Sequence, residues 1–399
     1  MERWEAIIVG AGPAGTATAL GLAARDPGLA RGTLLLDKAV HPRDKTCAGG
    51  VIPKALAVLA ELGVPFDVPH ARVDAATVHV PDGRRLDVPG DDLCRVVRRR
   101  EFDARLAWAA RDRGVVLREG ARVTAVVRDG DGVRVDTAAG SHWARVVVGA
   151  DGSGSQVRRA LVDAGDGLVG RAVMADVPVA ATRWDGDGRR RYDFDFRCVA
   201  QGVRGYRWVF PCVIDGVPHA NVGVYALPPV DGRTLQAELR ALCDEIGAAP
   251  ATWKAFPIRT WTGGPIAAPG VVLAGDAAGC DPLMGEGISY ALEYGTLAAE
   301  AIVRARTTGD WTFTGYQRAV ARGPLGRKLR LLRFAVRCFY GRAWPLAFRV
   351  AAASPRAQAI GLAWYNGVGG WDAKGPLAML GALATRRGPA PGRSALADA

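Results

Sequence analysis

The feature that most constrains the fold is a glycine-rich turn near the start of the 399-residue chain. The apolar run 4–9 predicts a buried parallel strand, and Gly10-Ala11-Gly12-Pro13-Ala14-Gly15 follows it directly, before an expected helix over 13–25. Glycines here permit a tight turn and bring backbone N–H groups close to a pyrophosphate, which the positive end of the helix also attracts. A second apolar strand over 33–36 ends at Asp37, whose carboxylate is placed to accept the ribose hydroxyls. This unit predicts a Rossmann-like, dinucleotide-binding fold.

The acid at position 37 also bears on which dinucleotide the turn accepts. An unpaired carboxylate disfavours a 2′-phosphate, so NADP is not expected in this site. The alternative interpretation is an ordinary glycine-rich turn between a strand and a helix. Both flanking elements and the acid favour nucleotide binding over that alternative.

Two further glycine motifs lie far along the chain. Gly149-Ala150-Asp151-Gly152 follows an expected three-stranded meander over 122–148. Gly275-Asp276-Ala277-Ala278-Gly279 follows an expected strand over 270–273 and precedes Pro282 and Gly285-Glu286-Gly287-Ile288. In that position Asp276 can fix a ribityl hydroxyl while backbone amides face the edge of a flavin. Each motif alone is equally well a turn, but three such sites together predict FAD.

Between the second and third motifs the pattern changes to short alternating strands with one helix over 234–246, which predicts an inserted antiparallel sheet. The expected class is α/β, with a Rossmann-like FAD-binding domain, an inserted antiparallel β-sheet for the substrate and a helical C-terminal region. The expected boundaries are 1–169 with 265–308 for the FAD-binding domain, 170–264 for the sheet, 309–385 for the basic helical region and 386–399 for a flexible tail.

With these motifs the chain resembles the FAD-dependent oxidoreductases of the aromatic-hydroxylase type over about residues 4–305. The resemblance implies that the first motif holds the ADP part, the second supports the nucleotide and the third meets the riboflavin. Arg100, ahead of Glu101-Phe102-Asp103, matches an arginine that contacts the cofactor in such proteins; alternatively it is a solvated arginine at a helix start. The implied cofactor contacts also include Lys38, Lys45, Cys47, Ala48, Gly49 and Val123.

Two further stretches resemble the geranylgeranyl reductase family. Arg43-Asp44-Lys45-Thr46-Cys47-Ala48-Gly49-Gly50 is similar to its Cys-x-Gly-Gly loop, and Tyr206-Arg207-Trp208-Val209-Phe210-Pro211 to its Tyr-x-Trp-x-Phe-Pro motif. A departure follows the second stretch, where Cys212 stands in place of a common lysine. The resemblance implies reduction of a carbon–carbon double bond in a polyprenyl lipid or a prenylated quinone.

The implied catalytic residues are Cys47, Tyr206 and Trp208, of which Cys47 and Tyr206 are the candidates to position substrate or proton. Implied substrate contacts are Tyr206, Trp208, Phe210, Pro211 and Pro282. Because Tyr206, Trp208 and Phe210 alternate, they face one side of a strand as an aromatic wall. The alternative interpretations are a buried small residue at Cys47 and plain core for the aromatic residues.

Two other functions stay open. The same fold serves monooxygenases that hydroxylate or epoxidise aromatic or terpenoid substrates, and a flavin-binding electron carrier needs no substrate pocket. No second nucleotide fingerprint is visible, so the electron donor is expected to be NAD(P)H bound transiently, or another reductant.

The net charge of +12 is concentrated near the C-terminus. The segment 311–371 contains ten Lys or Arg and no acid, so +12 less ten leaves about +2 for the rest. Within 322–350, apolar residues at helical spacing alternate with cations, which is typical of a helix at a membrane surface. A helix packed on its own protein with a solvated basic face is an equal alternative. The apolar content of the segment disfavours nucleic acid as a partner.

The seven cysteines are scattered without a Cys-x-x-Cys pair, and the five histidines do not cluster with them, so no metal site or disulfide framework is expected. The N-terminus does not resemble a signal peptide, and no uncharged apolar run is long enough to span a membrane. We therefore expect a cytoplasmic protein, either free or associated with the inner face of the membrane.

Overall fold

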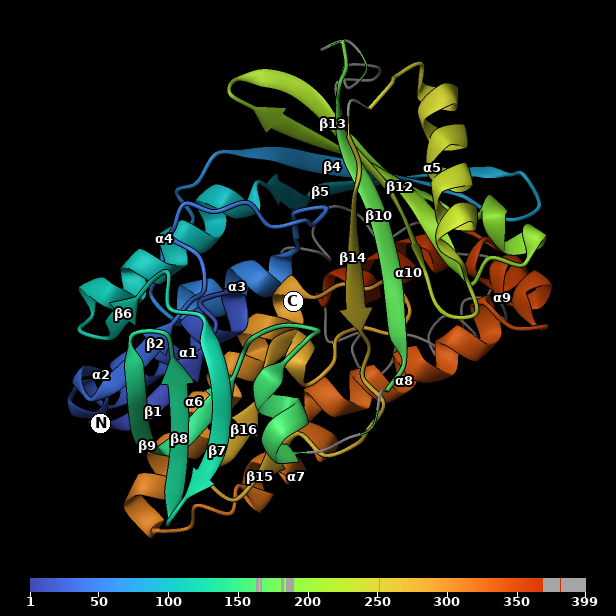
Figure 1. The fold of residues 1–399 in the computed structure, drawn as a ribbon. Coiled ribbons are helices and arrows are strands. Elements are labelled where there is room, and N and C mark those ends of the chain that lie inside the picture. The colour runs from blue at the N-terminus through green and yellow to red at the C-terminus, as the bar shows by residue number, and fades with distance from the viewer. Residues whose placement is uncertain are drawn as a thin grey trace.

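The computed structural model describes residues 1–162, 165, 167–180, 183, 190–250, 252–368 and 381. The expected tail over 386–399, and part of the region over 309–385, lie outside these residues. The fold is mixed α/β and contains two separate sheets, one at the lower left and the other at the upper right of Figure 1.

The first sheet contains the expected strand–helix–strand unit. The central strand β1 pairs in parallel with β2 on one side and β9 on the other, and the order is β15-β16-β9-β1-β2-β6, with β7 and β8 extending from β9. Its strands are β1 (Glu2–Val9), β2 (Thr33–Leu36), β6 (Val116–Arg118), β7 (Val123–Asp129), β8 (Gly132–Thr137), β9 (Gly140–Gly149), β15 (Ala267–Ala268) and β16 (Val271–Leu273). Ala6 to Val9 are buried on both faces, as an all-apolar parallel strand requires.

The second sheet is mostly antiparallel, in the order β14-β10-β13-β12-β11-β4-β5-β3, with one parallel pair between β11 and β4. Its strands are β3 (Gly50–Val51), β4 (His70–His79), β5 (Arg85–Val97), β10 (Val169–Pro178), β11 (Arg191–Asp195), β12 (Gly205–Ile214), β13 (Val217–Ala226) and β14 (Lys254–Arg259).

The expected boundary between the two sheets differs from the structure in one respect. The segment 1–169 was assigned as a whole to the FAD-binding domain, but it includes β3 and the hairpin of β4 and β5, which belong to the second sheet. The sheet is therefore built from two separate parts of the chain. The sequence pattern cannot show this, because a hairpin has the same alternation whichever sheet its edge joins. The strand β14 was also not expected.

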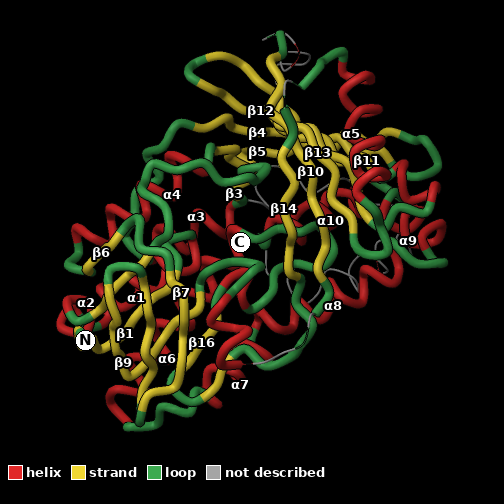
Figure 2. Tube along the Cα trace, in the orientation of Figure 1, coloured by secondary structure: helices red, strands yellow, loops and turns green. Residues whose placement is uncertain are grey.

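The helices, red in Figure 2, lie around the two sheets. α1 and α6 pack closely against each other beside the first sheet, where a Cβ on Gly295 would lie 2.5 Å from the carbonyl oxygen of Ala14. α5 covers the outer face of the second sheet, and α10 lies beneath it (Figure 1). The helices are α1 (Pro13–Arg25), α2 (Pro27–Arg31), α3 (Pro53–Glu61), α4 (Arg99–Asp112), α5 (Gly232–Ile246), α6 (Ile288–Thr308), α7 (Thr314–Arg322), α8 (Pro324–Phe339), α9 (Trp344–Ala351) and α10 (Pro355–Asn366).

The helical C-terminal region is confirmed as α7 to α10. Among the described residues, no helix combines the length and the apolar character that crossing a membrane requires.

Candidate active site

A cavity of about 860 Å³ lies between the two sheets. One side is formed where β1, β2, β9 and β16 end, at Val9, Leu36, Ala150 and Gly275. The other side is the inner face of the second sheet. In open α/β sheets, ligands bind outside the carboxyl ends of the parallel strands, as here.

The first glycine motif forms one end of this cavity. Gly10 adopts φ +102°, and a Cβ there would lie 2.4 Å from the carbonyl oxygen of Ala150, so only glycine fits. Helix α1 begins at Pro13 without a side-chain cap, which leaves its first N–H groups directed at a ligand. Gly10, Gly12, Pro13 and Ala14 line the cavity. Gly15 does not: a Cβ there would lie 1.9 Å from the carbonyl oxygen of Gly10, so this glycine permits the turn itself.

Asp37 links the end of β2 to the glycine turn. Its Oδ2 accepts a hydrogen bond of 2.8 Å from the N–H of Ala11, and its Oδ1 accepts one of 2.9 Å from the N–H of Ala39. The carboxylate is buried at the cavity wall, and Lys38 follows it there. Its position suits the ribose contact that the sequence predicted.

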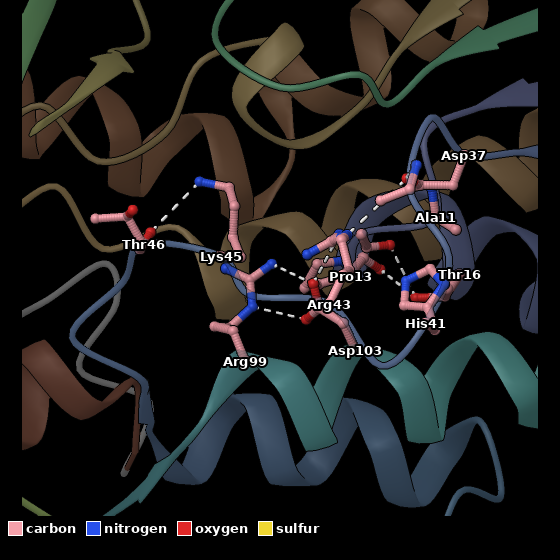
Figure 3. Close-up of polar contacts among 12 residues, drawn as sticks. Ala11, Pro13, Thr16, Asp37, His41, Arg43, Lys45, Thr46, Arg99 and Asp103 are labelled. Carbon is pink, nitrogen blue, oxygen red and sulfur yellow. Dashed lines mark hydrogen bonds and ion pairs between the residues drawn. The ribbon is translucent and has the colours of Figure 1, made fainter. Parts of the chain in front are cut away.

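A buried charge cluster lies over the same turn (Figure 3). Asp103 of α4 accepts hydrogen bonds of 2.6 and 2.8 Å from Arg99 and lies 3.0 Å from Nη2 of Arg43. Nη2 of Arg43 would lie 4.0 Å from a Cβ on Gly12. Among the described residues, Nη1 of Arg43 is buried and has no hydrogen-bond partner. A buried guanidinium nitrogen without a partner beside a helix N-terminus fits the pyrophosphate of FAD.

The assignment of Arg100 is wrong in position by one residue. Arg100 is exposed and does not line the cavity, whereas Arg99 does. Burial disfavours the charged form of Arg99, but the adjacent Asp103 carboxylate outweighs it and raises the pKa of Arg99 overall. Sequence reasoning missed Arg43 and Asp103, although Arg99 and Asp103 stand at the i, i+4 spacing of a helical ion pair.

The other two glycine motifs meet at the middle of the cavity. Gly275 adopts φ +62°, and a Cβ there would lie 2.8 Å from the Cβ of Ala14. Asp276 Oδ2 accepts a hydrogen bond of 3.3 Å from the hydroxyl of Ser153, which follows Gly152. The carboxylate of Asp151 accepts the N–H of Gln156 at 2.6 Å, and burial raises its pKa. The predicted residues from these motifs that line the cavity are Asp151, Gly152, Gly275, Asp276, Gly285, Gly287 and Ile288, and the predicted contact Val123, at the start of β7, lines it as well.

The loop over 43–50 carries Lys45, Cys47, Ala48 and Gly49 into the cavity. The Nζ of Lys45 lies 3.1 Å from the ring centroid of Phe256, on β14, a cation–π contact between the loop and the second sheet. Burial, helped by the nearby Arg99 cation, lowers the pKa of Lys45 to about 8. The Cys47 Sγ accepts a hydrogen bond of 3.4 Å from the N–H of Gly49.

The alternation in β12 directs Tyr206, Trp208 and Phe210 to the cavity, as predicted. The Tyr206 hydroxyl donates to the Met284 carbonyl oxygen at 2.7 Å, and the Trp208 Nε1 donates to Asn221 Oδ1 at 2.8 Å. Trp208 also lies flat over a glycine, because a Cβ on Gly223 would be 2.2 Å from its ring. The aromatic wall therefore has fixed ring orientations.

Two predicted substrate contacts do not line the cavity. Pro211 is the next residue after Phe210 in β12 and so faces the other side of the sheet. Pro282 is buried, and its carbonyl oxygen accepts a hydrogen bond of 3.2 Å from the hydroxyl of Tyr225. Tyr225, Phe256 and Tyr365 line the cavity instead, and the sequence analysis did not identify them.

No group of His, Cys, Asp and Glu within the part of the chain that the structure describes is arranged to hold a metal ion.

The sequence signature of the FAD binding domain family matches residues 3–304. The chain is 32% identical to a menaquinone reductase of Mycolicibacterium smegmatis, covering 88% of this chain and 89% of that protein. It is also 32% identical to a geranylgeranyl diphosphate reductase of Rhodobacter capsulatus, covering 77% of each.

Among solved structures, a geranylgeranyl bacteriochlorophyll reductase-like protein of Thermoplasma acidophilum has the same fold. The TM-score is 0.73 at 21% identity, over 88% of this chain and 91% of that one. With FAD-site geometry, family signature and relatives in agreement, the chain belongs to the FAD binding domain family and is an FAD-dependent oxidoreductase related to the geranylgeranyl reductases.

Proposed function

We propose that the protein reduces carbon–carbon double bonds in a hydrophobic substrate with a prenyl chain, either a polyprenyl lipid or a prenylated quinone. The observation that carries this proposal is the wall of Tyr206, Trp208 and Phe210, which faces the same cavity as the three glycine motifs. Fixed aromatic rings exclude water and bind an apolar chain, and the polar atoms of Tyr206 and Trp208 already have hydrogen-bond partners in the protein. The names of the two relatives, which refer to prenylated molecules, support the same substrate class.

The residues that would hold FAD are the amides of the first glycine turn, with Arg43 at the pyrophosphate, Asp37 at the ribose and Asp276 at the ribityl chain. When bound and reduced by the electron donor, the flavin would supply the hydride that one alkene carbon accepts. The remaining tasks for the protein are to orient the alkene and to deliver a proton to its other carbon.

Lys45 is the proton donor in this proposal. Its ammonium lies in the cavity against Phe256 of the substrate sheet, and a pKa of about 8 leaves it protonated at neutral pH yet able to release the proton. Tyr206 suits this task less well, because burial raises the pKa of its hydroxyl and because that hydroxyl already donates to Met284. Tyr206 and Cys47 then position the substrate.

The electron donor in this proposal is NAD(P)H bound transiently, or another reductant. The place of action is the cytoplasmic side of a membrane, since all seven cysteines are free thiols, as a reducing compartment favours, and since a prenyl lipid must be collected from a bilayer.

The test uses the purified flavoprotein, reduced under anaerobic conditions and mixed with menaquinone or a geranylgeranyl lipid. Oxidation of the flavin without oxygen, with a product that has gained two hydrogen atoms, is the expected result. A flavin that stays reduced until oxygen enters, followed by an oxygenated product, would contradict the proposal and identify a monooxygenase. Slow transfer of electrons to any acceptor, without a changed substrate, would indicate an electron carrier.

A further inference from the structure

The exposed face of α8 combines arginines with one apolar side chain. Arg327, Arg330, Phe334 and Arg337 are exposed, and their spacing of three, four and three residues places them on one side of the helix. Phe334 is 62% exposed, whereas other apolar residues of α8, such as Leu329 and Leu332, are buried. The helix therefore presents a large apolar ring to solvent between arginines.

The next helix repeats the arrangement. In α9, Leu346 and Arg349 are exposed three residues apart, Leu346 is 54% exposed, and Arg342 is exposed in the turn before the helix. Phe348 faces inward, where its ring centroid lies 5.1 Å from those of Phe196 and Phe339. Leu346 stands two residues before Phe348 and so points away from the protein.

The charge of these helices is not neutralised within the described part of the chain. None of the exposed arginines of α8 and α9 forms an ion pair with a carboxylate there. Arg330 donates instead to the carbonyl oxygen of Ala321, within the same region. Other arginines of the chain form ion pairs at the surface, as in the pair between Arg105 and Asp67 at 2.7 Å. The surface therefore attracts anions.

The helical C-terminal region reaches the active-site cavity through α10. Lys328 of α8 donates to the carbonyl oxygen of Trp364 at 2.8 Å, which ties α8 to α10. Tyr365 of α10 lines the cavity, with its ring centroid 5.5 Å from that of Phe194 in the second sheet. The Tyr340 hydroxyl, just after α8, donates to the Leu283 carbonyl oxygen at 2.8 Å. α8, which carries exposed arginines, is thus joined to α10, which lines the substrate side of the cavity.

We infer that the exposed side of α8 and α9 is a docking surface for an anionic lipid bilayer. The arginines contact head-group phosphates, and Phe334 and Leu346 enter the acyl boundary. A bilayer fits better than nucleic acid, because the phosphate backbone of a duplex offers no apolar environment for Phe334 and Leu346. The reason for docking, collection of a lipid substrate, rests on the proposed function, but the docking itself does not.

The experiment is sedimentation of the full-length flavoprotein with vesicles of phosphatidylglycerol and phosphatidylcholine, compared with vesicles of phosphatidylcholine alone. We expect binding only to the anionic vesicles, weakened by salt. The double variants Phe334→Ser/Leu346→Ser and Arg330→Gln/Arg337→Gln should each lower the binding constant at least tenfold. In the arginine variant two cations are lost, and each cation near the surface contributes roughly fivefold. In the other variant both side chains that enter the acyl boundary are lost. All four side chains are exposed, so the flavin spectrum should be unchanged.

The matched controls are Val217→Ser, for an exposed apolar residue of β13, and Arg105→Gln, for a partly exposed arginine of α4. Both should bind vesicles like the unmodified protein. Equal binding by all variants, or no binding to anionic vesicles, would overturn the inference. So would tight binding to duplex DNA that the Phe334→Ser/Leu346→Ser change leaves intact, because the surface would then serve nucleic acid.

The same variants separate this inference from the proposed function. With a detergent-solubilised substrate, the docking variants should keep full activity, because their changed side chains lie outside the cavity. Unmodified protein that binds vesicles but reduces no prenyl substrate would refute the proposed function and leave the docking surface supported.

Discussion

The guanidinium of Arg43 lies 3.0 Å from the carboxylate of Asp103, at the point where the loop after β2 crosses the start of α4. Asp103 is fully buried and also binds Arg99, so one carboxylate fixes two arginines beside the glycine turn. The Asp103 carboxylate orients Arg43 and leaves its Nη1 free for a ligand. The loop over 43–50 and the cofactor site therefore depend on Asp103, although the Asp103 side chain does not line the cavity.

We therefore expect Asp103→Asn to weaken both folding and FAD binding. Loss of the charge leaves two cations facing each other in a buried site, and breaking such a pair costs about 3 kcal/mol. The measurements are chemical unfolding and titration of the apoprotein with FAD. The control is Asp67→Asn, whose exposed pair with Arg105 on the same helix should contribute less than about 1 kcal/mol. Equal losses in the two variants would contradict this role of Asp103.

Gly10→Ala should prevent FAD binding and destabilise the protein. The added Cβ would meet the carbonyl oxygen of Ala150 at 2.4 Å in a conformation that disfavours any side chain, for a combined cost on the order of 3 kcal/mol. Gly130 also has positive φ, in an exposed turn with open space around it, so Gly130→Ala should cost only about 1 kcal/mol and keep the flavin. Thermal unfolding and the flavin content of the purified variants test this; a stable, yellow Gly10→Ala protein would show that the turn is not constrained.

Much of this site follows from local sequence, and the remainder depends on contacts between distant segments. The turn at Gly10, the acid at position 37 and the one-sided alternation of Tyr206, Trp208 and Phe210 are set by short-range geometry, so pattern and structure agree. The choice between Arg99 and Arg100 depends on which side of α4 faces the protein, and the buried Asp103 at i+4 indicates the answer only once burial is known. Phe256 and Tyr365 reach the cavity from β14 and α10, through sheet order and helix packing that no local pattern encodes.

Cys47→Ala should lower turnover by roughly tenfold without loss of FAD. The thiol lines the cavity and accepts the N–H of Gly49, so it shapes the loop where substrate and cofactor meet, but it makes no contact that the fold requires. Anaerobic single-turnover kinetics and the flavin-to-protein ratio are the readouts. Cys338→Ala, at a half-buried thiol of α8, is the matched control and should change neither. Unchanged turnover in Cys47→Ala would remove this residue from the mechanism.

The rate of substrate reduction should depend on the protonation of Lys45 and therefore on pH. Burial lowers the pKa of Lys45 from its usual value to about 8, so the ammonium is present below that pH and is lost above it. If Lys45 delivers the proton, the rate of substrate reduction should be constant near neutral pH and fall about tenfold per pH unit above about pH 8. Lys45→Met should slow the step about 100-fold, the lower end of what a positioned acid contributes, and should abolish this alkaline decrease.

Lys38→Met changes an exposed lysine of the same cavity wall and should keep the decrease. Rapid-mixing measurements across pH decide the matter: an alkaline decrease that persists in Lys45→Met would assign the proton to another group, such as a water molecule, and would leave Lys45 its contacts with Phe256 and with the Thr46 carbonyl oxygen.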